Sequence, residues 1–357
     1  METINVVYLT NILTHIHNMN IGDVFIRKGL EYILDKTFKE IGISPICRNV
    51  SRFADFDDAD FDDLEWADII VYAGMPQYNN LDDWSFYYDD EMWNDLNRIG
   101  KPILRLAGGA GYPSETWTPE QFSEYLRTSK HTLEILAKSM TNVKLTTTRD
   151  PLAQQFVHDC GYETTLLPCS GSFAALGYSE DETSREYNAI CLTPIYLRNR
   201  DDCNILMEEF KQTKTYLEEE FKKPCKVICQ VKSRDYEFLL KYFDEGDIIV
   251  RDSYDDLMKD YRKVDICVTS RLHCGLPMWG IGGRVIMIRV DTRATAVKSV
   301  GIPIINLSDY TLQAVQEVIN TDGFSKTVPQ NIVKKSVQFY VERIGSILDT
   351  MGKNPTV

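Results

Sequence analysis

The chain has 357 residues, of which 43% are hydrophobic and 26% charged, a composition typical of globular proteins and a length that suits two domains. The formal net charge of −14 argues against a general nucleic-acid-binding protein, because phosphate backbones would be repelled. No run of about 18 uncharged apolar residues indicates a transmembrane helix, and the N-terminus is typical of a first strand rather than of a signal peptide. We therefore expect a cytoplasmic protein.

Nine cysteines stand singly along the chain, and there are only five histidines. Their spacing does not match that of zinc ligands, so we expect reduced, mostly buried thiols and no structural metal.

In the first half, apolar runs alternate with helically spaced apolar residues. The acidic stretch Ser51–Asp68 is expected to be a solvated helix–loop segment. The predicted strands are Ile4–Thr10, Ile69–Tyr72, Pro102–Leu106, Val143–Thr148 and Leu166–Gly171. The predicted helices are Val24–Phe38, Thr128–Met140 and Leu152–Cys160, with another starting at Thr118.

A polar stretch without periodicity, Gly177–Tyr187, predicts a linker between two domains. We expect an N-terminal domain over residues 1–178, a C-terminal domain over 188–328, and a closing helix over 329–351 that crosses back to the first domain. Alternating strands and helices predict parallel sheets covered on both faces. In the second half the predicted strands are Ala189–Leu192, Lys226–Gln230, Ile248–Val250, Val264–Val268 and Gly283–Val290, and the predicted helices are Cys203–Lys222, Arg234–Phe243 and Ser253–Lys263.

Polar residues and glycines follow several predicted strands of the first half, which is where parallel sheets bind ligands. Asn20 and Asp23 lie between the first strand and the first helix, and Asp23 could either cap that helix or serve as a site carboxylate. Gly109 belongs to a glycine cluster after another strand, which would let main-chain amides approach a ligand. Arg149 follows a third strand.

The stretch Val264–Pro303 carries the strongest signal. A buried strand leads into Thr-Ser-Arg-Leu-His, and a second apolar run ends in Asp-Thr-Arg. Arg271 offers a planar fork for phosphate or carboxylate, and His273 can exchange a proton near neutral pH. The alternative is structural, because the same pair could cap a helix or satisfy buried carbonyl groups.

Five motifs at predicted strand ends resemble, in order and spacing, those of the polysaccharide pyruvyl transferase family: Asn20-x-Gly-Asp23, Gly108-Gly109-x-Gly111, Arg149-Asp150, Arg271-Leu272-His273 and Asp291-x-Arg293. The likeness covers about Ile4–Pro303 and is sharpest over Asp265–Gly301. It implies an α/β fold of two Rossmann-like domains, arranged as in GT-B enzymes, with the active site in the cleft between them. It further implies a role in polysaccharide biosynthesis, such as that of capsule or exopolysaccharide. The implied reaction moves pyruvate from phosphoenolpyruvate onto two hydroxyls of a sugar, giving a cyclic ketal and phosphate without a metal or a cofactor.

The resemblance also assigns residues to the substrates by matching position. Two arginines can bind the carboxylate and the phosphate of phosphoenolpyruvate through charge-assisted bidentate hydrogen bonds. Arg293 falls where many members carry a lysine, which keeps the charge but not the geometry. The expected substrate-binding residues are Arg149, Arg271, Leu272, Arg293, Asn20 and Gly109.

Three residues are expected to take part in the chemistry itself: His273, Asp23 and Arg271. Formation of the ketal requires protonation of the methylene carbon of the donor, so that C2 accepts a sugar hydroxyl. His273 is the expected general acid, and anionic neighbours would favour its charged form. Asp23 would take the hydroxyl proton.

The chain departs from the family at Cys169, which stands where members often have the acid of Leu-Pro-Asp, and at the reduced glycine run Gly74-Met75-Pro76. One alternative function is a glycosyltransferase of the same fold that uses a nucleotide sugar, and another is a non-catalytic scaffold. The acceptor sugar and the oligomeric state stay open. The acceptor could be polymeric, nucleotide-linked or lipid-linked, and a lipid-linked acceptor would bring the protein to the inner face of the membrane.

Overall fold

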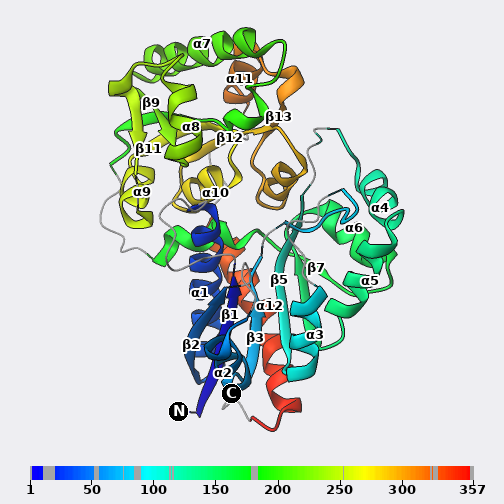
Figure 1. The fold of residues 1–357 in the computed structure, drawn as a ribbon. Coiled ribbons are helices and arrows are strands. Elements are labelled where there is room, and N and C mark those ends of the chain that lie inside the picture. Colours follow the sequence, from blue (N-terminus) through cyan, green and yellow to red (C-terminus); the bar gives the residue numbers. More distant parts are fainter. Residues whose placement is uncertain are drawn as a thin grey trace.

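The computed structural model describes residues 2–10, 21–51, 56–74, 76–83, 90–111, 114, 116–177, 184–251, 253–321, 324 and 329–353. These residues form two α/β domains, one above the other in Figure 1, and each domain is built around one parallel sheet. Within this part of the chain, no helix combines the length and the apolar character needed to cross a membrane.

The first domain contains a seven-stranded sheet in the order β2-β1-β3-β5-β6-β7, with β4 paired to the end of β5. Its strands are β1 Glu2–Thr10, β2 Ile43–Ser51, β3 Ile69–Tyr72, β4 Pro76–Tyr78, β5 Ile103–Ala110, β6 Val143–Thr148 and β7 Thr165–Leu166. Its helices are α1 Ile21–Ile41, α2 Asp58–Trp66, α3 Asp90–Ile99, α4 Pro119–Arg127, α5 Lys130–Ser139, α6 Pro151–Asp159 and the 3₁₀ helix η2 Ser170–Gly177.

The second domain contains a six-stranded sheet in the order β10-β9-β8-β11-β12-β13, in which the direction of winding reverses between β8 and β11. Its strands are β8 Tyr187–Cys191, β9 Cys225–Cys229, β10 Ile248–Val250, β11 Val264–Thr269, β12 Arg284–Arg289 and β13 Ile304–Asn306. Its helices are η3 Pro194–Tyr196, α7 Cys203–Phe221, α8 Lys232–Leu239, η4 Glu245–Asp247, α9 Tyr254–Tyr261, α10 Leu272–Gly280, η5 Thr292–Val300, η6 Leu307–Asp309 and α11 Leu312–Ile319.

Central strands are buried along their whole length, which explains why their apolar runs stand out in the sequence. Every residue of β5 and of β8 is buried. By contrast, β2 lies at the edge of its sheet with most side chains exposed or half-exposed, and it carries Pro45. An edge strand tolerates proline and needs no apolar run, so this strand gave no sequence signal.

The segment after β6 differs from the sequence prediction of a strand over Leu166–Gly171. Strand β7 ends at Leu166, and the chain winds into η2 from Ser170. Pro168 lacks the N–H that would continue the ladder, so pairing stops before it. The residues Cys169 to Ser172 are thereby turned toward the second domain, where η2 packs against both α1 and α10.

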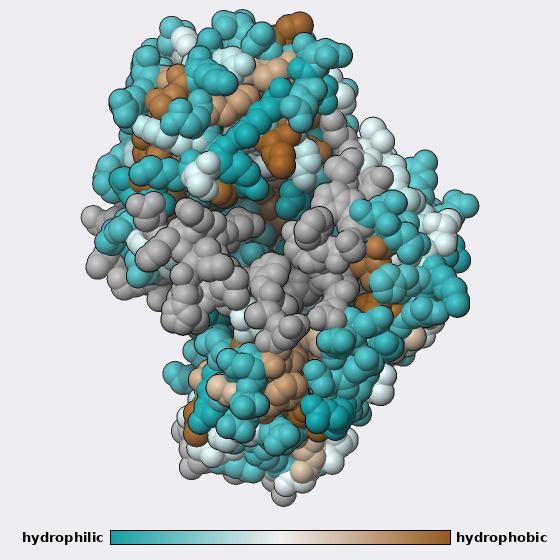
Figure 2. All heavy atoms as spheres, in the orientation of Figure 1, coloured by the Kyte–Doolittle hydropathy of each residue, from teal (hydrophilic) through white to brown (hydrophobic). Residues whose placement is uncertain are grey.

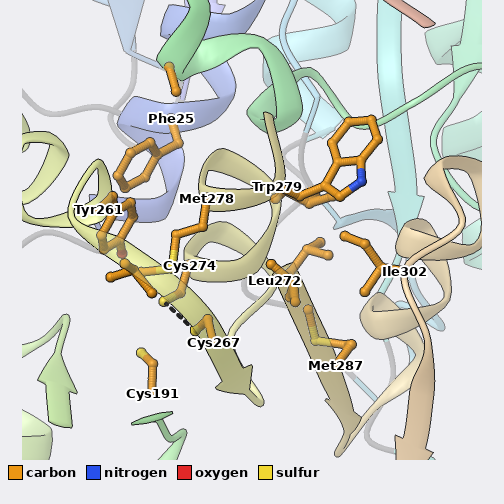
Figure 3. Packing of buried hydrophobic residues seen from close by; sticks show 14 of the residues in the cluster. Phe25, Cys191, Tyr261, Cys267, Leu272, Cys274, Met278, Trp279, Met287 and Ile302 are labelled. Carbon is orange, nitrogen blue, oxygen red and sulfur yellow. Dashed lines mark hydrogen bonds between the residues drawn. The ribbon is translucent and has the colours of Figure 1, made fainter. Parts of the chain in front are cut away.

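The two domains share a hydrophobic core, drawn in Figure 3. Phe25 of α1 stacks on Tyr261 of α9, with ring centroids 5.6 Å apart, and also contacts Tyr254. Gly29 of α1 and Gly280 of α10 lie so close to η2 that a Cβ on either would overlap the carbonyl of Ser170 or Ser172. The absence of side chains at these two glycines lets η2 lie tightly between the domains.

The last helix, α12 Pro329–Thr350, lies on the first domain although it follows the second in sequence. Val337, Ile344 and Leu348 join the core formed by β1 and α1. The hydroxyls of Tyr340 and Thr147 lie 3.3 Å apart, and Lys353 pairs with Asp68 at 2.7 Å. Most of the predicted linker, residues 178–183, lies outside the described residues, and β8 begins at Tyr187.

Candidate functional site

Arg149 lies at the end of β6, immediately before α6, and its side chain is fully buried. Its backbone N–H donates to the carbonyl of Gly108 at 2.9 Å, and Nη1 lies 3.7 Å from the sulfur of Cys169. Within the described part of the chain, Nε and Nη2 are buried without a hydrogen-bond partner. A buried guanidinium in this state is costly unless an acceptor joins it, so the geometry indicates an anion site.

The backbone around Arg149 is fixed by Asp150, the N-cap of α6. One carboxylate oxygen accepts from the N–H of Ala153 and the other from the N–H of Ala110, each at 2.9 Å. Burial raises the pKa of Asp150, while these N–H donors and Arg149 lower it. Gly109 contacts the guanidinium directly, because a Cβ there would overlap Nε of Arg149. Gly109 therefore makes room for a side chain, which differs from the predicted role of presenting its amide to a ligand.

His273 faces Arg149 from the second domain, in the first turn of α10. Its backbone, with φ −87° and ψ 17°, interrupts the helix in the bridge region, where many active-site residues are found. Nε2 lies 3.9 Å from the sulfur of Cys169, so the thiol contacts both the imidazole and Arg149. A Cβ on Gly171 would come within 3.2 Å of the imidazole, which explains the glycine at the start of η2.

The charge around His273 is opposite to the one that we expected from the resemblance. Burial lowers the pKa of His273 well below its usual value, and the positive charges of Arg149 and Arg293 lower it further. The imidazole is therefore neutral near pH 7, because burial disfavours its charged form and the two charged residues that act on it are cations.

Arg293 lies in the first turn of η5, after the end of β12. Its Nε donates to Asp291 at 2.9 Å and its Nη2 to the hydroxyl of Tyr196 at 3.0 Å. Asp291 also caps η5 by accepting from the N–H of Arg293. The side chain keeps about a third of its surface exposed, so its charge can act on a ligand from the edge of the site.

Arg271 makes its contacts inside the second domain. Its Nη2 forms an ion pair with Asp235 of α8, and its Nε donates to the carbonyl of Leu192 at 2.9 Å. Both side chains of the pair are buried. These bonds join the ends of β8 and β11 at the point where the sheet winding reverses, and they fix the start of α10. The sequence did not indicate that Asp235 pairs with Arg271, because the two residues lie 36 positions apart.

The other predicted site residues are Leu272, Asp23 and Asn20. Leu272 is buried in the core shared by the domains, as Figure 3 shows, so its side chain is a packing residue. Asp23 is half-buried in the first turn of α1, where a negative charge favours the helix N-terminus. Asn20 lies outside the described residues.

The structure adds polar groups that the sequence did not single out. The hydroxyls of Thr148, Ser170 and Ser172 are buried without a hydrogen-bond partner in the described residues. All three lie within three residues of Arg149 or Cys169 in the chain. The sequence analysis missed Ser170 and Ser172, because it predicted a strand as far as Gly171, whereas the chain leaves the sheet before Pro168.

These groups meet at the boundary of the two domains, where η2 packs against α10. The described residues in view in Figure 2 form a largely hydrophilic surface. Among the described residues, no group of three or more His, Cys, Asp or Glu side chains could hold a metal ion. The arrangement offers a fixed guanidinium, a neutral imidazole and a second cation. Such a site can bind a dianion and exchange one proton with it.

A family model described as polysaccharide pyruvyl transferase matches residues 20–276. The match spans Arg149, Cys169 and His273 and ends within α10. No curated protein sequence matches the chain significantly.

The chain is also similar in structure to solved proteins. S. aureus MnaA, solved with UDP, is 10% identical with a TM-score of 0.53, and the match covers 99% of each chain. UDP-GlcNAc 2-epimerase of Methanocaldococcus jannaschii, in complex with UDP-GlcNAc and UDP, is 11% identical with a TM-score of 0.52 over 96% of this chain and 100% of that one. At these identities the likeness shows the fold alone, and it confirms the predicted pair of Rossmann-like domains in a GT-B-like arrangement.

Proposed function

The chain belongs to the polysaccharide pyruvyl transferase family, and we propose that it transfers pyruvate from phosphoenolpyruvate onto two hydroxyls of a sugar, forming a cyclic ketal and releasing phosphate. The observation that carries this proposal is the buried Arg149, whose Nε and Nη2 have no partner in the described residues, beside the imidazole of His273. Phosphoenolpyruvate supplies the acceptors that this guanidinium lacks.

Arg149 binds the donor through its two unpartnered nitrogens, which can form a bidentate pair with a carboxylate or a phosphate. Arg293 adds a second positive charge from the side of the second domain. Because a guanidinium that is already buried loses little solvation on binding, its bonds to the donor are strong. The buried hydroxyls of Ser170 and Ser172 are further candidates for the donor's oxygens.

The reaction then needs one proton at the methylene carbon of the donor and one removed from each sugar hydroxyl. His273, once protonated, gives its proton to the methylene carbon, and C2 becomes open to attack by the first hydroxyl. Asp23, at the start of α1, is the proposed base for that hydroxyl. Attack by the second hydroxyl on C2 breaks the bond between C2 and the phosphate oxygen and closes the ketal, and the phosphate leaves with the proton of that hydroxyl. No step of this sequence calls for a metal or a cofactor.

Arg271 has a positioning role in this proposal. Its pair with Asp235 and its bond to Leu192 hold the end of β11, from which α10 presents His273. The resemblance assigns Arg271 to the donor, whereas in the structure its Nη2 is paired with Asp235 and its Nε is bonded to the carbonyl of Leu192. We propose that it acts on the donor only through the position of His273.

The acceptor is a sugar or glycan that enters at the boundary between the domains. A polymeric, nucleotide-linked or lipid-linked acceptor fits this reaction equally, and a lipid-linked one would require the protein to work at a membrane face. Trp117 lies at the domain boundary, where its carbonyl accepts from Nη2 of Arg289 at 3.1 Å. Aromatic side chains such as this one offer a face to sugar rings. Trp117 is therefore the first residue to substitute when acceptors are screened.

Calorimetric binding of phosphoenolpyruvate to the wild type and to Arg149→Met tests the donor. We expect saturable binding that weakens at least about 100-fold in the variant, as for the loss of a preorganised charged donor. Phosphate release on addition of candidate acceptors then tests the transfer. Lys144→Met, which removes an exposed charge elsewhere in the first domain, should bind like the wild type.

The rival function, glycosyl transfer from a nucleotide sugar, shares the fold. The turn after β8, residues 192–202, has no glycine, whereas glycines let the corresponding turn of dinucleotide-binding Rossmann domains approach a pyrophosphate. Titration with UDP-sugars in the same calorimeter separates the two functions. If phosphoenolpyruvate gives no binding signal and one nucleotide sugar binds saturably, our proposal is wrong and glycosyl transfer is the function.

A further inference from the structure

Cys169 lies at the centre of the candidate site, between the two residues that the proposed reaction uses. Its sulfur is 3.7 Å from Nη1 of Arg149 and 3.9 Å from Nε2 of His273, and its side chain is fully buried. The flanking helix η2 holds this residue against both domains, because the carbonyls of Ser170 and Ser172 pack on glycines of α1 and α10. The position of the sulfur is therefore fixed by the packing of the domains.

A thiol in this place is uncharged, whereas a carboxylate would carry a negative charge. A carboxylate between a guanidinium and an imidazole would neutralise the first and favour the protonated form of the second. A thiol bonds weakly to both and does neither. Accordingly Nε and Nη2 of Arg149 have no partner among the described residues, and burial together with Arg149 and Arg293 keeps the pKa of the His273 imidazole low.

We propose that Cys169 is a positioning residue that keeps Arg149 unpaired and His273 uncharged until an anion enters, so that the anionic donor is bound together with one proton. The proton comes from solvent and is held on the imidazole. In the transfer it passes to the methylene carbon of the donor, leaving the imidazole neutral again. This inference rests on the proposed function for the identity of the donor, but the coupling itself requires only a dianion.

The charged groups around His273 support this coupling. From the end of β6 comes Arg149, whose neighbour Asp150 is bonded to two backbone N–H groups. From η5 comes Arg293, which is paired with Asp291. Helix α1, which also packs against α10, carries Asp23 in its first turn, and the carboxylate of Asp235 on α8 is bonded to Arg271. A bound dianion would place two negative charges near the imidazole and so oppose the effect of Arg149 and Arg293 on its pKa.

The test is the number of protons taken up on anion binding, measured by calorimetry near pH 7 in two buffers with different ionisation enthalpies. Sulfate serves as a dianion that does not titrate near neutral pH, and phosphoenolpyruvate is the proposed donor. The proteins are the wild type, His273→Gln, Cys169→Ser and Cys169→Asp. Cys169→Ser is the conservative control, because a hydroxyl is also neutral and similar in size.

We expect the wild type and Cys169→Ser to take up between about one half and one proton with either anion. His273→Gln should bind sulfate through Arg149 with an uptake close to zero. Cys169→Asp should bind either anion at least about tenfold more weakly and also with little uptake, because its carboxylate pairs Arg149 and protonates the imidazole in advance. A merely structural role for Cys169 would not change the proton count.

The inference is overturned if the wild type binds sulfate without proton uptake, if Cys169→Asp keeps the wild-type uptake and affinity, or if neither anion binds. Failure of the proposed function looks different. In that case phosphoenolpyruvate binds no better than sulfate and releases no phosphate with any acceptor, while the uptake with sulfate is still lost in His273→Gln and in Cys169→Asp.

Discussion

Two buried arginines, one in each domain, each stand between a strand and the helix that follows it, yet their surroundings are opposite. Arg149 follows β6 in the first domain, and Arg271 follows β11 in the second. The guanidinium of Arg271 is satisfied by Asp235 and by the carbonyl of Leu192. That of Arg149 has a single weak contact, with Cys169, while Nε and Nη2 have no partner among the described residues.

The difference shows which arginine holds the fold and which is ready for a ligand. A buried charge that is paired and hydrogen-bonded is a structural element, and removing its partner leaves the other charge exposed to a low dielectric. A buried charge without acceptors lowers stability and is retained where function needs it. The same sequence pattern, a strand followed by arginine, thus has a structural outcome in one domain and a ligand-binding outcome in the other.

The largest effect is expected for Arg271→Met, which leaves Asp235 buried without its cation. We expect a loss of about 3–5 kcal/mol in the free energy of unfolding, measured by chemical denaturation. The double variant Arg271→Met with Asp235→Leu should recover most of the loss, since both charges are then removed. Wild-type stability in the single variant would mean that the pair does not hold α10.

Arg149→Met should not lower the free energy of unfolding, in contrast to Arg271→Met. Because Nε and Nη2 make no bonds in the described residues, removal of the guanidinium should leave the free energy of unfolding unchanged or raise it by about 1–2 kcal/mol. Phosphoenolpyruvate should stabilise the wild type against unfolding and leave the variant unaffected. A variant as unstable as Arg271→Met would show that Arg149 is structural and would remove the contrast.

The sequence predicted the positions of these two arginines but not their contacts, because their partners lie far away in the chain. The buried strands and the family motifs are local patterns, and they predicted the fold and placed both arginines at strand ends. Asp235 lies on α8, across the second domain, and Cys169 meets His273 over a separation of 104 residues. No local pattern reports contacts at such separations, so the sequence could not say which guanidinium is paired or that His273 faces cations.

A third change moves Arg149 relative to His273 without touching either. A Cβ at Gly280 or Gly29 would overlap a carbonyl of η2, so each alanine variant should cost about 1–3 kcal/mol of stability. Both should also lower turnover, because η2 positions Cys169 between the domains. Gly345→Ala in α12 is the matched control, since nothing lies within 4 Å of a Cβ there and alanine favours helices. Equal behaviour of the three variants would show that η2 is not held by these contacts.

The smallest effect is the pH dependence of stability that His273 contributes. Its pKa is lowered in the folded protein, first by burial and then by Arg149 and Arg293, whereas an unfolded histidine has a pKa of about 6.5. As the pH falls below about 6.5, the unfolded chain binds a proton that the folded protein does not. Stability should therefore fall with decreasing pH, by at most about 1.4 kcal/mol per pH unit, and His273→Gln should lose this slope.

The pH dependence of stability that His273 contributes also distinguishes Arg149 from Arg271. In Arg149→Met one of the cations that act on the imidazole is gone, so its folded-state pKa should rise, and the slope should level off at a higher pH than in the wild type. In Arg271→Met it should stay as in the wild type, because burial, Arg149 and Arg293 account for the lowered pKa of His273. Denaturation at a series of pH values, taken as the difference between each protein and its His273→Gln derivative, isolates this single proton. If the slope levels off at the same pH in both arginine variants, Arg149 does not act on His273, and the coupling of anion and proton lacks its physical cause.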